Sequence, residues 1–108
     1  MFSAVAGPYS AATAEERQRN LDAMNEAAAR LMEMGHVPVI GMNAALPVPE
    51  KAVVSDRYAA IMAVSLAVVA ACNALLLMGE SPGANKERAP IRSQGKPISS
   101  RIEDAPLS

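Results

Sequence analysis

The chain has 108 residues, which is enough for one domain with one hydrophobic core and too few for two. Ten lysine and arginine residues against eleven aspartate and glutamate residues give a formal net charge of −1. This balance supplies no basic surface for a nucleic acid polymer or an anionic membrane. Cys72 is the only cysteine, so no intrachain disulfide can form, and residues 1–6 do not resemble a secretory leader. We therefore expect a cytoplasmic protein.

The first elements are a strand and a long amphipathic helix. The apolar segment Phe2–Ala6 stops at Gly7-Pro8, as a buried strand stops at a turn. Thr13 and Glu16 form a capping box, which predicts a helix that begins there. Apolar residues then recur at helical spacing until Gly35, a residue that commonly ends helices.

The middle of the chain predicts a second strand, a loop and a second helix. Val37–Ile40 is the strand, and Pro38 confines it to a sheet edge because proline lacks an amide donor. Gly41–Lys51 is expected to be a loop, and Asp56 to cap a helix that runs to about Cys72. That helix is apolar on nearly every side, which predicts additional burial in a homodimer or larger assembly. The residues expected to face the sheet are Ile61, Val64, Val68 and Val69.

The uncharged run Ala59–Met78 has the length of a membrane span. Much of it is alanine, however, and its character changes at Asn73. A helix followed by the buried strand Ala74–Met78 explains the run equally well, because the strands of a covered parallel sheet are continuously apolar. We therefore favour a helix and a strand, and expect no membrane partner.

The last part of the chain predicts a third helix and a fourth strand. Gly79–Gly83 forms a turn, Ala84 begins the helix, and Pro90 should shorten or kink it. Gly95–Ser99 is a short strand, and Ser100–Ser108 is expected to be a mobile polar tail.

This alternation predicts a single α/β domain over residues 1–99, flavodoxin-like or Rossmann-like, with three layers and a four-stranded parallel sheet in the order 2-1-3-4. The winding of such a sheet reverses between its first and third strands, and ligands bind at the carboxyl ends of the strands at that point. The two loops that leave the sheet there are Gly7-Pro8-Tyr9-Ser10 and Gly79–Ala84. Both lead into helix N-termini, which favour an anion such as a phosphate.

Glu87 has two interpretations. It can complement the dipole of the third helix as an ordinary first-turn carboxylate. Alternatively, it is a nucleophile that the helix N-terminus keeps ionised, next to a turn that holds the substrate. The candidate binding residues have alternatives as well, because Tyr9 can stack on a base or simply pack, and Ser10 and Ser81 are also ordinary turn residues. The candidate substrate-binding set is Gly7, Tyr9, Ser10, Ser81, Gly83 and Ala84.

The chain resembles the nucleoside 2-deoxyribosyltransferase superfamily, in particular its small, poorly characterised bacterial branch. The resemblance runs from Phe2 to about Ser99. It is carried by the segments Ala6–Ser10, Gly35–Val39, Cys72–Leu77, Glu80–Glu87 and Gly95–Ile98.

The resemblance implies chemistry at the N-glycosidic bond of a nucleoside or a nucleoside 5′-monophosphate. A glutamate that matches Glu87 attacks the anomeric carbon, and water or a second base resolves the glycosyl-enzyme, as in retaining glycosidases. No cofactor is implied, and a zinc site has no support because His36 is the only histidine. Oligomers with sites near subunit contacts are also implied.

Two positions depart from the family pattern. Ser65 stands where the family places an aspartate that holds a sugar hydroxyl and aids catalysis, and Asn73 replaces another common aspartate. A serine can still bind a hydroxyl, but it brings no charge to an oxocarbenium-like centre. The alternative is therefore a non-catalytic nucleotide-binding module that has lost the family aspartate.

Overall fold

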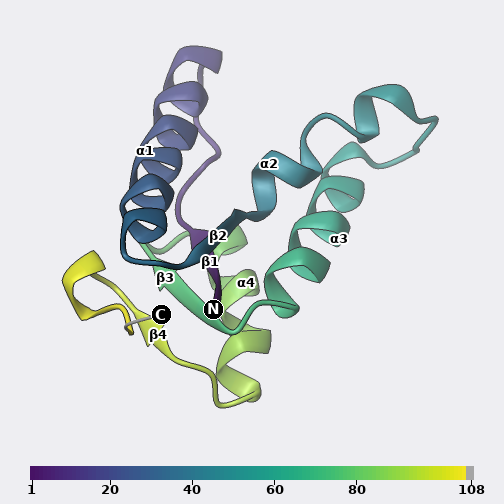
Figure 1. Cartoon of the computed structure of the whole chain (residues 1–108). Helices are drawn as coiled ribbons and strands as arrows, with labels where there is room; N and C mark the ends of the chain where they lie inside the picture. Colours follow the sequence, from purple (N-terminus) through teal and green to yellow (C-terminus); the bar gives the residue numbers. More distant parts are fainter. Residues whose placement is uncertain (107–108) are drawn as a thin grey trace.

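Four short strands form one parallel sheet in the order β2-β1-β3-β4 (Figure 1). The computed structural model describes residues 1–106. The strands are β1 (Phe2–Ala6), β2 (Val37–Ile40), β3 (Ala74–Leu77) and β4 (Ile98–Ser99). The α-helices are α1 (Ala14–Glu33), α2 (Gly41–Ala45), α3 (Arg57–Ala70) and α4 (Pro82–Ser93), and two 3₁₀ turns are η1 (Pro49–Lys51) and η2 (Ile102–Asp104). The predicted α/β architecture and strand order are confirmed.

The sheet has a hydrophobic cluster on each face, which makes three layers. Alternate residues of a strand point to opposite faces, so Ala4 and Leu75 lie on one side of the sheet, and Val5 and Leu76 on the other. The first side packs with residues of α3 and α4, such as Val69, Ala84 and Ile91. The second side packs with the buried face of α1, which consists of Met24, Ala27, Ala28 and Leu31.

Caps predicted from the sequence begin the two long helices. Thr13 Oγ1 accepts from the Glu16 amide at 3.1 Å, and Asp56 accepts from the Ala59 amide at 3.0 Å. Within residues 1–106, no helix is long and apolar enough to cross a membrane, since α3 has only 14 residues. The run that matched a membrane span thus consists of most of α3 followed by β3.

Several expectations about the middle of the chain are wrong. The segment Gly41–Lys51 contains α2 and η1 and is not simply a loop. On α3 the buried residues are Met62, Ser65 and Val69; of the four residues expected to face the sheet, only Val69 is buried. The third predicted helix, α4, begins at Pro82 rather than Ala84, and it continues past Pro90 to Ser93.

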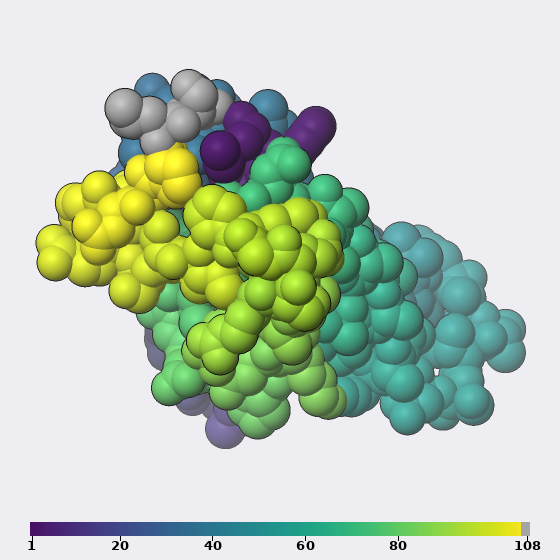
Figure 2. Space-filling view, turned by 90° about the horizontal axis from the view of Figure 1, so that it is seen from below, coloured from purple at the N-terminus to yellow at the C-terminus, as the bar shows by residue number. Residues whose placement is uncertain are grey.

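The segment that follows β4 packs against the body of the molecule, so the prediction of a mobile tail is wrong for residues 100–106. Ile102 and Ala105 contact the hydrophobic cluster on the α1 side of the sheet. The buried His36 also joins this segment to the sheet, because its Nε2 donates to the carbonyl of Pro106 at 2.6 Å and its Nδ1 is 2.5 Å from Ser3 Oγ. Figure 2 shows the C-terminal segment in yellow against the body, whereas the segment that joins α2 to α3 projects at the other side. Leu107 and Ser108 of the predicted tail lie outside the described residues.

Candidate functional site

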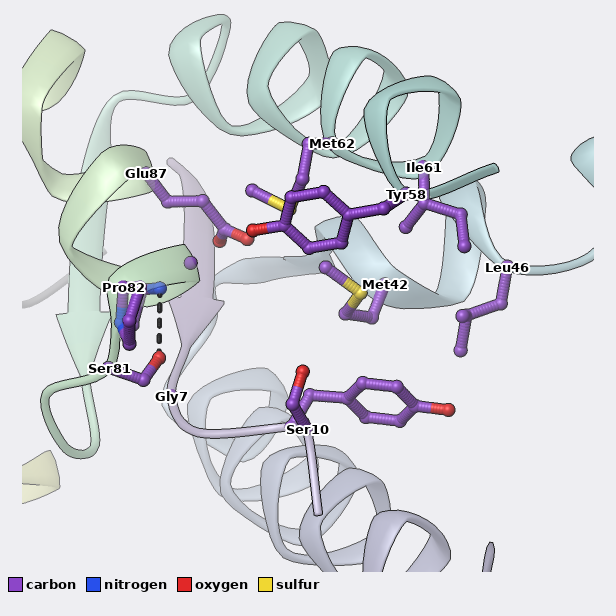
Figure 3. A pocket seen from close by; sticks show the side chains of 13 residues that line it. Gly7, Ser10, Met42, Leu46, Tyr58, Ile61, Met62, Ser81, Pro82 and Glu87 are labelled. Atoms are coloured by element: carbon purple, nitrogen blue, oxygen red, sulfur yellow. Dashed lines mark hydrogen bonds between the residues drawn. The ribbon is translucent and has the colours of Figure 1, made fainter. Parts of the chain in front are cut away.

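A pocket of about 300 Å³ lies beside the carboxyl ends of β1 and β3 (Figure 3). This volume is at the lower end of the range for small-molecule sites and suits one compact ligand. All six predicted substrate-binding residues line the pocket, and Glu87 lines it too. The complete lining is Gly7, Tyr9, Ser10, Met42, Leu46, Tyr58, Ile61, Met62, Ser81, Pro82, Gly83, Ala84 and Glu87.

The two predicted loops meet here because their strands are hydrogen-bonded neighbours. Ala6, the last residue of β1, pairs with Leu77, the last residue of β3. The loops therefore leave the sheet side by side, and they touch, since a Cβ added to Gly79 would lie 3.1 Å from Pro8 Cδ. The prediction of a pocket at the point where the winding reverses follows from this register.

The N-terminus of α4 forms one wall, but it offers few free donors. Ser81 caps the helix: its Oγ accepts from the Ala84 amide at 3.0 Å, and its carbonyl accepts from the Asn85 amide at 2.8 Å. Pro82 has no amide hydrogen, so Gly83 N–H is the first-turn donor that stays unpartnered in residues 1–106. The N-terminus of α1 was expected to contribute as well, but no residue of that helix lines the pocket.

Glu87 and Ser65, the two predicted catalytic residues, are in contact. Ser65 Oγ on α3 donates to Oε1 of Glu87 on α4 at 2.9 Å. Glu87 is 5% exposed and points into the pocket, whereas Ser65 is completely buried behind it. Ser65 therefore reaches a ligand only through Glu87.

The pKa of Glu87 is governed by its burial. It is the sixth residue of α4, one turn beyond the position where the helix dipole acts most strongly. Burial raises the pKa of Glu87, and the hydrogen bond from Ser65 offsets part of this rise. The helix N-terminus was expected to favour the ionised carboxylate, whereas desolvation, which opposes ionisation, is the largest influence on the pKa of Glu87.

Gly41, the first residue of α2, allows Ser65 to occupy its place. A Cβ added to Gly41 would collide with Ser65 Oγ and would lie 3.1 Å from the Ser65 carbonyl oxygen. The close approach of α2 and α3 therefore requires glycine at position 41. The Gly41 backbone packs against the Ser65 side chain, whose hydroxyl contacts Glu87.

The wall opposite the α4 N-terminus is apolar and was missed by sequence reasoning. Residues of α2 and α3 build most of it, in particular Met42, Ile61 and Met62, and Tyr58 turns its hydroxyl toward Glu87 in Figure 3. Lys86 Nζ lies 5.5 Å from the centroid of the Tyr58 ring, a cation–π contact. Met42 was not foreseeable because its segment was expected to be a loop.

Other residues with reactive or metal-binding side chains lie elsewhere. Asn73 Oδ1 accepts from the Phe2 amide at 3.0 Å at the other end of the strands, so Asn73 has a structural role. Cys72 is buried, and burial raises its pKa. In the part of the chain that the structure describes, no three His, Cys, Asp or Glu side chains are grouped so that they could hold a metal ion.

Comparisons of the chain with protein-family models, with curated proteins and with solved structures found no match. The function must therefore be argued from the pocket and from the residues that line it.

Proposed function

We propose that the chain cleaves or transfers at the N-glycosidic bond of a nucleoside or a nucleoside 5′-monophosphate, with Glu87 as the nucleophile. The observation that carries the proposal is the buried carboxyl group of Glu87, which a serine hydroxyl fixes at 2.9 Å beside a pocket of about 300 Å³. The resemblance to the nucleoside 2-deoxyribosyltransferase superfamily supports the same assignment. Two of the segments that carry it contribute residues to this pocket, among them Tyr9, Ser81 and Glu87.

The chemistry needs Glu87 in its ionised form. Ser65 donates to Oε1, which leaves Oε2 to attack the anomeric carbon C1′ of the sugar. The bond from C1′ to the base nitrogen breaks, and its electron pair leaves with the base, which takes a proton from water. The result is a glycosyl ester of Glu87.

The second step restores the carboxylate. A water molecule attacks C1′, the ester C–O bond breaks, its electron pair returns to Glu87, and the proton of the water passes to solvent. In transfer, a nitrogen of a second base takes the place of that water. Ser65 acts as a positioning residue in both steps, because it contacts Glu87 and does not line the pocket.

A specific feature also favours a second candidate function. The site pairs its carboxyl group with the neutral Ser65, so no second carboxylate faces the developing positive charge at C1′ from that position. The second candidate is a nucleotide-binding module without catalysis. A ligand would then raise the melting temperature by mass action, and no base would be released.

The test is incubation with a panel of nucleosides and 5′-nucleotides, with free base measured by chromatography. We expect the wild type to release base and Glu87→Gln to release none while it still binds ligand. The matched control is Glu80→Gln, at a residue of the loop before α4 whose side chain is 71% exposed and does not line the pocket. Equal release by wild type and Glu87→Gln would refute the nucleophile, and ligand binding without release would favour the binding module.

A further inference from the structure

The pocket lining holds one carboxyl group and no cationic side chain. Of its lining residues in the described part of the chain, only Glu87 carries a formal charge when ionised. The polar side chains among the remaining lining residues are neutral hydroxyls of serine and tyrosine, and Gly83 adds a backbone N–H. A ligand with its own negative charge would meet no side-chain cation among these residues.

The cations near the pocket have other contacts. Arg57, next to the lining residue Tyr58, pairs with Glu50 at 3.2 Å, and Arg88, next to Glu87, pairs with Glu80 at 3.5 Å. Both pairs therefore neutralise the arginines locally.

Lys86 is another base beside the lining, and Arg17 donates to the carbonyl of Ala11, next to the lining residue Ser10, at 3.0 Å. The ammonium group of Lys86 lies over the Tyr58 ring, on the apolar wall and not at the N-terminus of α4. The Lys86 ammonium group therefore lies on the side of the pocket where a base ring would pack. It does not lie on the side of Ser81 and Gly83.

The two walls of the pocket differ in polarity, and this difference orients a nucleoside. Ser10, Ser81 and Gly83 supply hydroxyls and an amide on one side, whereas Met42 and Ile61 are among the apolar residues on the other. A flat base gains most from the apolar wall, and sugar hydroxyls gain most from neutral hydrogen-bonding groups.

Resting on the proposed function, we infer that the substrate is an uncharged nucleoside and not a nucleoside 5′-monophosphate. The base packs against the apolar wall, C1′ lies at Glu87, and the sugar hydroxyls, the 5′-hydroxyl included, contact the wall at the N-terminus of α4. A 5′-phosphate would find one free helix amide, Gly83 N–H, instead of the several amides or charged donors that phosphate sites supply.

Electrostatics strengthens this discrimination. A phosphate dianion in the same small pocket as an ionised Glu87 is repelled, and repulsion between charges is large where water is excluded. The phosphate would also raise the pKa of Glu87 further and reduce the ionised fraction that attacks.

The first experiment compares kcat/KM for base release from 2′-deoxyadenosine and thymidine, from their 5′-monophosphates, and from their uncharged 5′-O-acetyl derivatives. We expect both uncharged series to exceed the monophosphates by about tenfold or more near neutral pH. The acetyl derivatives separate bulk at the 5′ position from charge. Monophosphates that match or exceed the nucleosides overturn this inference, while their release of base still supports the proposed function.

The second experiment measures binding of pseudouridine and its 5′-monophosphate by calorimetry. Their base is joined by a carbon–carbon bond and cannot be released, so the wild type can be used. We expect the preference for the nucleoside to shrink in Glu87→Gln, whose amide does not repel phosphate, and to persist in Glu33→Gln, an exposed residue of α1 that does not line the pocket. An unchanged preference in Glu87→Gln overturns the electrostatic basis of the inference.

Lys86→Ala tests one further route to phosphate binding. If that change lowers kcat/KM for the monophosphates alone, Lys86 holds a phosphate and the inference is wrong. Equal effects on both classes support it. If neither class binds or releases base, the proposed function fails and the inference fails with it.

Discussion

Ser65 Oγ lies 2.9 Å from Oε1 of Glu87, and both side chains are withdrawn from solvent. The pair joins α3 to α4 at the pocket, and Gly41 on α2 leaves the space that Ser65 fills. A short helix, a glycine and a buried serine thus determine where the carboxyl group of Glu87 can lie.

The first prediction concerns the pH dependence of base release. Burial raises the pKa of Glu87, and attack requires its ionised form, so kcat/KM should fall as the pH decreases through that raised pKa. Ser65→Ala removes the hydrogen bond that lowers this pKa, so the falling limb should move to higher pH. The same change should reduce the free energy of unfolding by about 1–2 kcal/mol. A pH profile that Ser65→Ala leaves in place would show that Ser65 does not position Glu87.

The second prediction concerns Ser65→Asp, which introduces the carboxylate implied by the family resemblance. An aspartate behind Glu87 adds a negative charge on the Glu87 side of C1′, which should stabilise the developing positive charge and raise the maximal rate above that of the wild type. The structure adds two costs. Position 65 is completely buried against Gly41, so the melting temperature should fall, and two carboxyl groups in contact share a proton, so the optimum should move to higher pH. If the maximal rate does not exceed that of the wild type at any pH, the expected gain is refuted.

The third prediction compares alanine at two glycines near the site. Gly41→Ala forces a Cβ against Ser65, so we expect a loss of about 1–3 kcal/mol in the free energy of unfolding and a loss of base release. At Gly83 the nearest neighbour of an added Cβ is Met62 Cε at 3.8 Å, so the fold should accept alanine.

Gly83→Ala nevertheless places a methyl group on the lining of the pocket. We therefore expect an unchanged or slightly higher melting temperature. The KM or Kd for ligand should be higher than that of the wild type. Denaturation and ligand titration of both variants check the pair. Normal ligand affinity in Gly83→Ala would contradict the placement of ligand at the N-terminus of α4.

The fourth prediction concerns assembly. The outward side of α3 exposes Ala59, Ala63 and Ala67 and presents no charged residue after Arg57. We expect a dimer or larger homo-oligomer with α3 in its interface. Ala63→Glu should shift light scattering at micromolar concentration toward the monomer, whereas Ala29→Glu, at an exposed alanine of α1, should not. A wild type that is monomeric at that concentration would refute this prediction.

The sequence predicted the sheet because its signals are local. Gly7-Pro8 ends β1, Pro38 confines β2 to the edge, and the alternating elements then leave one natural strand order, which brings both loops to the same edge of the sheet. The six binding residues line the pocket for this reason.

The features that the sequence did not predict depend on contacts between distant residues. α3 is apolar on nearly every side, so its pattern cannot show that Ser65 is buried; that position depends on Glu87, 22 residues away. α2 has no side-chain cap, since Ile40 precedes it, and so its start gives no signal. The C-terminal segment is held by His36 and Pro106, which are 70 residues apart.

The central claim is that Glu87 forms a covalent bond with the sugar. The direct measurement is intact-protein mass spectrometry, with peptide mapping, after mixing with a 2′-fluoro-2′-deoxyarabinosyl nucleoside, whose fluorine slows hydrolysis of the intermediate. We predict a mass increase of one glycosyl group, mapped to Glu87 in the wild type and in Glu80→Gln and lost in Glu87→Gln. The claim would be contradicted if the wild type releases base but carries the glycosyl group on another residue. It would also be contradicted if Glu87→Gln gains the same glycosyl mass as the wild type.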